Sequence, residues 1–502
     1  GQTSYGSLTS IGESPVDAMV IYTGSDDGQV QLTKDGGKSW TNITSKIPGV
    51  PPQTYVSTVL PSKYKAGRVY VTFDGHFTDD YNPYAFVSED FGATWRSISA
   101  GLPETSVNRI REHPKNQRVL VLAHARGVHV SNDGGSTWTS LATNMPTVPA
   151  NDAVFHERDN ALVVGTHGRG IWVLDDAGPL EAMTADAMKA DATLFPIPRA
   201  RLMSTFSPQA WYGHGEFFAP NPDWNAVVSY NLRDGGTGQA DIVVADAAGK
   251  TIRTLKGPVA KGVNRVVWDL RYAPPVDSAN LPTGGGRGGG GGRGGPPAAI
   301  PVGFPGGGEG GGGRGNAPAG PLVLPGSYSV RVALPGVSKP LTGSVLVEAD
   351  PLPKFSAVDR AARQAILMRI YEWTKTLGEA RGSMRVLMAQ RDSIKADFAT
   401  GGAADAGARA DSLDARITRL SGEVDRTLTA VNQQRGPIEA WSGLPSLDQR
   451  SALGYALDDA QKAVTELNKL VVTDIPAAYK GMAKKEWTRK VKAVAVPTTR
   501  PT

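Results

Sequence analysis

A motif of eight residues that occurs three times in the first third of the chain limits the possible folds more than any other feature. It reads TKDGGKSW at residues 33–40, SEDFGATW at 88–95 and SNDGGSTW at 131–138. The closing tryptophans are 55 and 43 residues apart, close to the ~40 to 50 residues of a four-stranded propeller blade. Because β-rich segments flank each copy, the repeat predicts that residues 1–180 are the last blades of a β-propeller.

Each position of the motif has a physical reason. The recurring residues are Asp35, Gly37 and Trp40, then Asp90, Gly92 and Trp95, then Asp133, Gly135 and Trp138. The glycines supply the positive φ of a tight hairpin, and the carboxylates accept backbone N–H bonds within that turn. The tryptophans open the next strand, where we expect them to be buried between blades. We interpret these residues as structural; a calcium-binding loop is the alternative for the aspartates, and we expect no metal and no cofactor.

A fourth, incomplete copy follows. ALVVGTHGRGIWVLDD at residues 161–176 repeats the third blade with Asp176 in the place of Asp133, but lacks the glycine and tryptophan that complete the motif. It predicts the last blade or the strand that closes the ring. Propellers commonly have 4 to 8 blades and leave open edges otherwise. We therefore expect that an upstream propeller segment or another chain completes the ring.

The motif resembles the Asp box, or bacterial neuraminidase repeat, of sialidases, sortilin-type receptor ectodomains and two-propeller xyloglucanases. VIYTGSDDGQVQLTKDGGKSW combined with GTHGRGIWVLDD is most similar to the C-terminal portion of large bacterial exported proteins in the sortilin-like propeller group, which are often labelled glycosyl hydrolases. The resemblance implies an extracytoplasmic protein that is secreted, periplasmic or on the cell surface. It does not establish an activity, because one fold hosts many functions.

The loops on the blade face opposite the Asp boxes carry a set of polar residues. They are Asp26, Asp27, Asp74, His76, His124, Arg126, His167 and Arg169. Arginines and histidines there would suit acidic groups, and aspartates would suit hydroxyls or cations. We predict that His124 and His167 occupy equivalent positions in adjacent blades. The alternative is that each side chain packs and hydrogen-bonds within its own loop.

These residues favour an exported binding or scaffold protein that recognises peptide or glycan through the propeller face. A glycoside hydrolase, sialidase-like or xyloglucanase-like, is the alternative. It needs two carboxyls ~5 to 9.5 Å apart, and no pair stands out, so the catalytic residues are unknown. A structural component of the cell envelope that self-associates as a homo-oligomer is the third interpretation.

The sequence after residue 180 predicts two more regions, so the chain is expected to be multidomain and mainly β, with helices at its C-terminal end. Residues 181–222 are expected to link the propeller to an immunoglobulin-like β-sandwich at 223–350, which contains a glycine-rich insertion at about 283–320. Heptad-like apolar spacing predicts an antiparallel α-helical bundle at 351–495, followed by a tail at 496–502. We interpret the insertion as a flexible loop because it lacks the aromatics that stack on RNA bases.

Composition narrows the class of protein further. The chain has no cysteine, so disulfides and thiolate metal sites are excluded. A net charge of +5 without a dense basic block argues against a nucleic-acid partner. The sequence contains no run of about 18 apolar residues, so it predicts no membrane span. The first residues lack the features of a signal peptide, so we expect any export signal to lie upstream.

Overall fold

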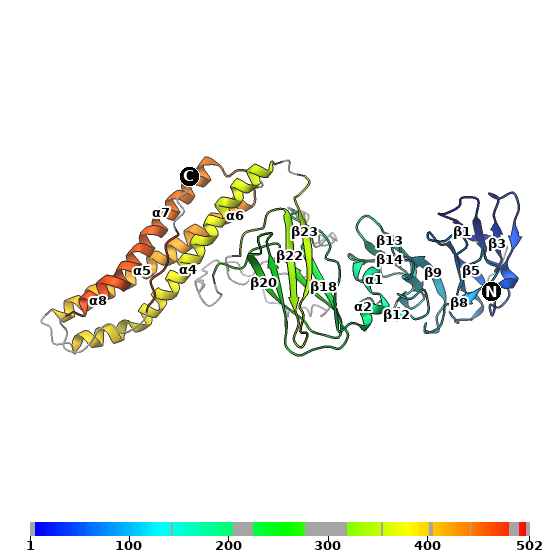
Figure 1. Ribbon diagram of the computed structural model, residues 1–502, viewed down its shortest axis with the longest axis horizontal. Coiled ribbons are helices and arrows are strands. Elements are labelled where there is room, and N and C mark those ends of the chain that lie inside the picture. The colour runs from blue at the N-terminus through cyan, green and yellow to red at the C-terminus, as the bar shows by residue number, and fades with distance from the viewer. Residues whose placement is uncertain are drawn as a thin grey trace.

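The computed structural model of this 502-residue chain describes residues 6–141, 144–203, 224–276, 319–352, 355–400, 405–441, 443–480 and 491–497. Three regions follow one another along an elongated molecule: a stack of small sheets, a β-sandwich and a helical bundle (Figure 1). Within the described residues, no helix has the length and apolar character needed to cross a membrane.

The first region consists of four antiparallel sheets, which we call blades 1 to 4. Blade 1 contains β1 (Leu8–Glu13), β2 (Ile21–Ser25), β3 (Val30–Thr33) and β4 (Thr41–Asn42). Blade 2 contains β5 (Tyr55–Pro61), β6 (Val69–Asp74), β7 (Tyr84–Ser88) and β8 (Arg96–Ser97). Blade 3 contains β9 (Val107–Glu112), β10 (Leu120–His124), β11 (Gly127–Ser131) and β12 (Thr139–Ser140). Blade 4 has three strands: β13 (Ala150–His156), β14 (Ala161–Thr166) and β15 (Ile171–Leu174).

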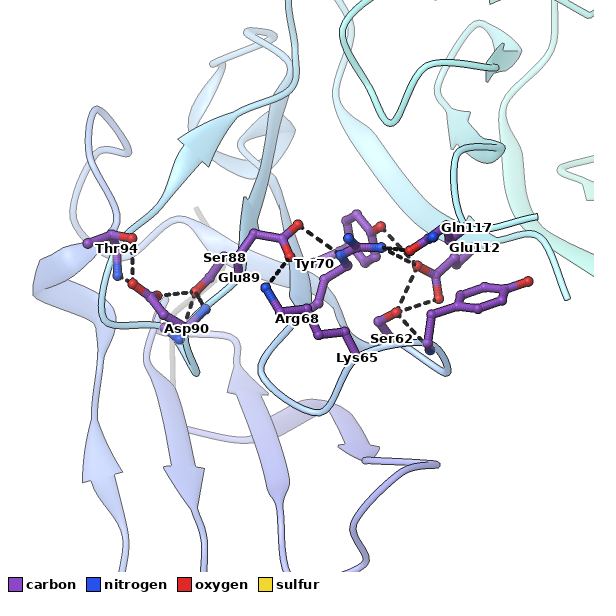
Figure 2. Close-up of polar contacts among 12 residues, drawn as sticks. Ser62, Lys65, Arg68, Tyr70, Ser88, Glu89, Asp90, Thr94, Glu112 and Gln117 are labelled. Carbon is purple, nitrogen blue, oxygen red and sulfur yellow. Dashed lines mark hydrogen bonds and ion pairs between the residues drawn. The ribbon is translucent and has the colours of Figure 1, made fainter. Parts of the chain in front are cut away.

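The Asp boxes join the third and fourth strands of blades 1 to 3, and their aspartates bond within their own hairpins as predicted. In blade 2, Asp90 Oδ1 accepts the Thr94 backbone N–H at 2.8 Å, and Asp90 Oδ2 accepts the Thr94 hydroxyl at 2.6 Å. The Ser88 hydroxyl donates to Asp90 Oδ1 at 2.9 Å and accepts the Gly92 N–H at 2.8 Å (Figure 2). These bonds lower the pKa of Asp90 to about 2, chiefly through the Thr94 side chain.

The box tryptophans are less buried than the sequence predicted. Trp95 and Trp138 are half-buried, whereas Trp40 is 44% exposed. Trp138 Nε1 donates to the Ile98 carbonyl of blade 2 at 2.7 Å, and Trp95 packs against the core shared by blades 1 and 2. The prediction is wrong for Trp40 because each tryptophan is covered by the preceding blade, and no described blade precedes blade 1.

The first strand of each blade carries a β-bulge at the same place. The bulged residues are Thr9, Ser57, Asn108 and Asn151. Three of their side chains bond to the following blade: Thr9 Oγ1 to Val56 O at 2.6 Å, Ser57 Oγ to Val107 O at 2.7 Å, and Asn108 Nδ2 to Ala150 O at 2.8 Å. Each acceptor carbonyl belongs to the residue just before the next bulge. The blades are therefore joined by one repeated polar contact.

Apolar cores form between consecutive blades: one between blades 1 and 2, one between 2 and 3, and one between 3 and 4. Blades 1 and 4 lie at opposite ends of the stack (Figure 1), and no core cluster of the described residues joins them. The four blades are thus an open arrangement, as the repeat number predicted.

The second region is a two-sheet sandwich around a single core. One sheet has the order β16 (Ala192–Leu194), β18 (Ala226–Leu232), β21 (Gly262–Trp268). The other has the order β17 (Ala200–Arg201), β23 (Leu341–Glu348), β22 (Gly326–Ala333), β19 (Ala240–Ala245), β20 (Thr251–Gly257). The predicted linker is only partly a linker, because it supplies α1 (Gly178–Ala182), α2 (Ala185–Lys189) and the strands β16 and β17. These strands fold into the sandwich by pairing with β18 and β23.

The glycine-rich insertion lies between β21 and β22, and its residues 283–318 are outside the described ones. The described chain on its two sides is paired: Tyr272 N donates to Pro321 O at 3.0 Å, and Val323 N donates to Leu270 O at 2.8 Å. The insertion therefore leaves and re-enters the sandwich at one point.

The third region is an antiparallel helical bundle, as predicted (Figure 1). It contains α4 (Ala357–Ala399), α5 (Ala406–Gln433), α6 (Arg435–Glu439), α7 (Leu447–Lys469), a π-helical turn at Leu470–Asp474, and α8 (Ile475–Ala478). Capping boxes at Ser356 and Ser446 start α4 and α7. Gly436 and Pro437, residue types that usually interrupt a helix, are part of α6. Glu439 of α6 bonds to Arg271 at 2.7 Å and thereby joins the bundle to the sandwich. Of the predicted tail, residues 498–502 are outside the described ones.

Candidate binding face

The topology places all eight predicted site residues at one end of the blades. They lie on, or directly before, the loops that join the second and third strands: β2–β3, β6–β7, β10–β11 and β14–β15. The Asp boxes follow the third strands and so lie at the other end, because antiparallel strands reverse direction at each turn. We call the end with the eight residues the loop face.

In blade 1 the predicted carboxylates shape their own loop. Asp26 Oδ1 accepts the Ser7 N–H at 2.8 Å, while Asp26 N donates to Ser7 O at 3.0 Å. Asp27 accepts a hydrogen bond from the Ser25 hydroxyl. Both aspartates remain partly exposed, so they keep the loop in place and still give it negative charge.

In blade 2, Asp74 and His76 form a carboxylate–imidazole pair. His76 Nδ1 lies 2.7 Å from both Asp74 oxygens, and the His76 backbone N–H donates to Asp74 Oδ1 at 3.0 Å. Asp74 is buried and the His76 ring is exposed. Because Asp74 fixes Nδ1, Nε2 is the ring nitrogen through which His76 can contact a ligand.

The β6–β7 loop also presents aromatic rings that the sequence analysis did not select. The His76 ring packs on Phe77 with centroids 3.9 Å apart, and Phe77 packs on Tyr55 at 5.5 Å. Phe77 and Tyr81 are both exposed. The aromatic-rich run HFTDDYNPY at residues 76–84 was the available signal, since exposed rings in a loop favour a binding role.

Asp80 anchors the same loop. Its Oδ2 accepts the Tyr84 hydroxyl at 2.7 Å, and its Oδ1 accepts the Asn82 N–H at 3.0 Å. Burial opposes ionisation, but these hydrogen bonds outweigh it and lower the pKa of Asp80. Burial and the bond to this carboxylate raise the pKa of Tyr84 to about 12. Asp80 is therefore ionised at neutral pH.

In blade 3 the structure moves His124 from the loop face to the layer beneath it. His124 is 1% exposed; its Nδ1 accepts the Arg126 N–H at 3.1 Å, and its Nε2 lies 2.7 Å from His129 Nδ1. Both ring nitrogens are thus occupied. Burial, with help from His129 and Arg126, lowers the pKa of His124 to about 4. His124 is neutral at pH 7 and supports the turn that carries the exposed Arg126.

In blade 4, His167 and Arg169 are exposed on the β14–β15 loop. The predicted equivalence of His124 and His167 is wrong. His124 pairs with Val107, just before the bulge of blade 3, and the residue in that place in blade 4 is Thr166, which pairs with Ala150. His124 lies opposite Gly127, and Thr166 lies opposite Gly170, whose carbonyl accepts the Thr166 N–H at 3.1 Å. Between these paired positions blade 4 has one residue more than blade 3, and His167 therefore falls in the loop.

The loop face is divided by charge. Blades 1 and 2 contribute carboxylates: Asp26, Asp27, Asp74, Asp79 and Asp80. Blades 3 and 4 contribute the exposed cations Arg126 and Arg169, with His167 beside them. The exposed rings of Phe77 and Tyr81 lie on the acidic half. The loops that join the second and third strands are therefore acidic in blades 1 and 2 and basic in blades 3 and 4.

The opposite end of the blades is occupied by structural contacts. Glu112 of blade 3 accepts the Ser62 hydroxyl at 2.8 Å and the Tyr70 hydroxyl at 3.0 Å, both from blade 2. Beside it, Arg68 bonds to Glu89 at 2.8 Å and to Gln117 at 3.1 Å (Figure 2). These polar groups satisfy one another across the boundary between blades 2 and 3. At this boundary the charged groups therefore hold the two blades together.

Metal binding and general acid catalysis are two roles that carboxyl groups could have at the loop face. Among the described residues, no group of three or more His, Asp or Glu could hold a metal ion. Burial raises the pKa of Asp176, a property expected of a general acid. However, Asp176 follows the third strand of blade 4 and so lies at the Asp-box end.

Blades with Asp-box hairpins at one end and polar loops at the other define residues 6–176 as part of a β-propeller. Comparison with protein families narrows the class: the family model Sortilin-Vps10, described as "Sortilin, neurotensin receptor 3", matches residues 28–144. Residues 28–144 are thus similar to part of a sortilin-type propeller. No curated protein matches the chain significantly.

Similar solved structures include enzymes and a peptide-bound protein. The GH74 xyloglucanase from Xanthomonas campestris is 12% identical, with a TM-score of 0.28, over 34% of this chain and 29% of that one. The GH74 enzyme from Niastella koreensis is 15% identical, with a TM-score of 0.28, over 46% of this chain and 29% of that one. YCF48 bound to D1 peptide is 11% identical, with a TM-score of 0.27, over 50% of this chain and 69% of that one. The chain thus spans less than a third of the length of these two GH74 structures.

Proposed function

We propose that this protein binds a peptide segment of mixed charge across the loop face of its propeller blades. The observation that carries the proposal is the division of that face into an acidic, aromatic half on blades 1 and 2 and a basic half on blades 3 and 4. A peptide can offer cations to one half, carboxylates to the other and apolar side chains to Phe77 and Tyr81. A neutral glycan carries no charges that complement either half.

The family comparison agrees with a binding role, since the matching family description names a receptor. We further propose that the protein works outside the cytoplasm, as the resemblance to exported sortilin-like proteins implies. In this proposal the sandwich is an immunoglobulin-like spacer, and the helical bundle mediates assembly. The location, the spacer role and the assembly role do not depend on the proposed peptide binding, and each can be tested without it.

Glycoside hydrolysis is the second candidate, and the loop-face carboxylates are what favour it. Two carboxyls must flank the scissile bond, and one of them must hold a proton at working pH. Asp80 instead has a lowered pKa, and Asp74 is bonded to His76. Binding without hydrolysis therefore fits these two residues better.

Selection from a random peptide library immobilised on beads tests the proposal. We expect the selected peptides to contain both basic and acidic residues. Removing both cations with Arg126→Ala and Arg169→Ala should weaken binding about tenfold or more, because hydrogen bonds to charged groups contribute about 1.5 to 3 kcal/mol. Arg158→Ala is the matched control: Arg158 is an exposed arginine at the other end of blade 4, paired with Asp159.

Two outcomes would contradict the proposal. One is equal binding by the double variant and the Arg158→Ala control. The other is selection of no peptide while a glycan panel yields a ligand whose cleavage is lost in Asp74→Asn or Asp80→Asn. The second result would establish the hydrolase alternative.

A further inference from the structure

The contact between the sandwich and the helical bundle gathers several arginines around one carboxylate. Glu439 Oε1 of α6 accepts Arg271 Nη1 at 2.7 Å and the Leu322 N–H at 3.0 Å. Glu439 Oε2 lies 3.8 Å from Arg435 Nε, and its charge also acts on Arg363 of α4. Among the described residues, no second carboxylate forms an ion pair with these three arginines. Three permanent positive charges thus share one negative charge.

Two of these arginines have an unused hydrogen-bonding edge. Arg363 Nη1 donates to the Trp441 carbonyl, and Arg435 Nη1 donates to the Ala319 carbonyl. The Nε atoms of both arginines are buried and have no hydrogen-bond partner in the part of the chain that the structure describes. Buried donors without an acceptor are rare in folded proteins. Two of them in one cluster therefore point to a ligand that accepts from both.

Elsewhere in the chain, the same edge of an arginine binds carboxylates. Arg158 Nε and Nη2 donate to the two Asp159 oxygens at 2.9 and 2.7 Å. Arg201 Nε and Nη2 both donate to Glu348 Oε2, at 3.3 and 2.9 Å. The planar guanidinium fits carboxylate and phosphate groups along this edge. The two unused edges at the junction therefore have the chemistry that binds an oxyanion.

The balance of charge at the junction also favours an anion. Arg360 stands one turn before Arg363 in α4 and adds a fourth positive charge, and its side chain has no partner in the described ranges. Burial lowers the pKa of Arg363, and Arg360 lowers it further; burial and Arg271 do the same to the pKa of Arg435. The side chains of Arg271 and Arg435 are still 25% and 22% exposed. An ion from solution can therefore reach the cluster.

We propose that the junction between sandwich and bundle binds an oxyanion, a phosphate or carboxylate group, on the Nε–Nη2 edges of Arg363 and Arg435. The anion offsets the positive charge that Glu439 alone does not balance. Because Arg271 belongs to the sandwich and the other arginines belong to the bundle, the bound anion holds the two regions together. This site is separate from the loop face and does not depend on the peptide binding proposed there.

Hydrogen exchange of the full chain, with and without inorganic phosphate at constant pH, tests the proposal. Sodium chloride at equal ionic strength is the reference, because any salt screens the repulsion between the arginines. We expect phosphate to slow exchange in peptides that cover residues 319–324 and 435–441 more than chloride does. Peptides from the propeller blades should not change. A parallel titration with malonate, a dicarboxylate, shows whether a phosphate or a carboxylate group binds more tightly.

Two arginine variants locate the anion. Arg363→Gln and Arg435→Gln should each raise the phosphate concentration at half-maximal slowing about tenfold or more, because each removes a charged pair of donors. Arg409→Gln is the matched control: Arg409 lies at the start of α5 and is paired with Asp405 at 2.7 Å. This variant should respond to phosphate as the unsubstituted chain does. Protection by phosphate that persists unchanged in both junction variants would overturn the proposal.

A change at Glu439 should have the opposite effect. Glu439→Gln keeps a neutral acceptor for Arg271 and for the Leu322 N–H but removes the negative charge. Phosphate should then act at a severalfold lower concentration, because the positive potential of the cluster rises. This result decides the matter even if the arginine variants do not fold. Weaker phosphate binding by Glu439→Gln, or equal effects of phosphate and chloride on the unsubstituted chain, would show that the junction binds no oxyanion.

Discussion

Blades 2 and 3 lie inside the stack and blades 1 and 4 lie at its ends, yet all four derive from one repeat. Inside the stack, Trp138 bonds to Ile98 of the neighbouring blade; at the end, Trp40 is exposed. The hairpin itself is the same in both places, because Asp35 and Asp133 each accept the N–H four residues on, at 2.9 Å. The motif therefore specifies the turn, while the neighbouring blade determines burial.

Blade 4 extends the comparison to an incomplete Asp box. Asp176 occupies the box position, since Ala177 N donates to Asn160 O just as Gly134 N donates to Arg118 O in blade 3. No hydroxyl stands four residues on, because that residue is Leu180, which packs in the core of blades 3 and 4. Asp176 Oδ2 is buried without a partner. Burial then raises the pKa of Asp176, whereas the Ser39 hydroxyl and amide lower that of Asp35 to about 2.

The largest expected effect is at the tryptophans. Trp138→Ala removes the bond to Ile98 and the packing between blades 2 and 3, and should cost about 3 kcal/mol. Trp40→Ala removes an exposed ring and should cost about 1 kcal/mol or less. Hydrogen exchange of the peptides from β11, β12 and β3 measures both losses locally, as a chain with three regions need not unfold in two states. Equal losses would contradict the role given to the neighbouring blade.

A smaller difference is expected at the box glycines. Gly37 and Gly135 have φ of 92° and 85°, so alanine at either costs about 1 to 2 kcal/mol from the left-handed backbone alone. At Gly135 the new Cβ also overlaps Ile98, which adds about 1 to 3 kcal/mol of overpacking. Gly135→Ala should therefore shift exchange of its hairpin more than Gly37→Ala. The double variant Gly135→Ala with Ile98→Ala provides the check, since it should recover part of that excess.

The blade repeat and the three-part organisation could be predicted because they depend on local spacing. Glycine at positive φ, the Asp-box turn and the heptad stripes of α4, α5 and α7 are all encoded within short windows. The exposure of Trp40 could not be predicted this way, because it depends on a blade that the described residues do not contain. The strands β16 and β17 were missed because they are three and two residues long, and their pairing partners are distant in sequence.

The candidate site was predictable in position but not in detail. Strand alternation placed the eight residues at one end of the blades, yet one extra loop residue moved His167 relative to His124. The burial of His124 depends on His129, which faces it across the hairpin. The bulge residues share no sequence motif, since Thr9, Ser57 and Asn108 have in common only a hydrogen-bond donor. Their role emerges from strand register.

The smallest expected effect is the change in stability when the box aspartate is replaced by asparagine. This change should be a loss in the intact box of blade 2 and a gain in the incomplete box of blade 4. Asp90→Asn weakens bonds to Thr94 and should cost about 1 kcal/mol at pH 7, a modest value because the carboxylate is exposed. A carboxyl with a lowered folded pKa stabilises above its unfolded pKa of about 3.9 and loses that contribution as pH falls towards 2. Asp176 has a raised folded pKa, so its ionisation destabilises at pH 7, and this penalty is lost as pH falls from the folded pKa to the unfolded pKa of about 3.9. Asp176→Asn should therefore stabilise blade 4 at pH 7, and both variants should approach the unsubstituted chain near pH 2. Exchange of the β7 and β15 peptides at pH 7, 5 and 3, corrected for intrinsic exchange rates, measures both; a loss of stability in Asp176→Asn at pH 7 would show that the incomplete box still stabilises its turn.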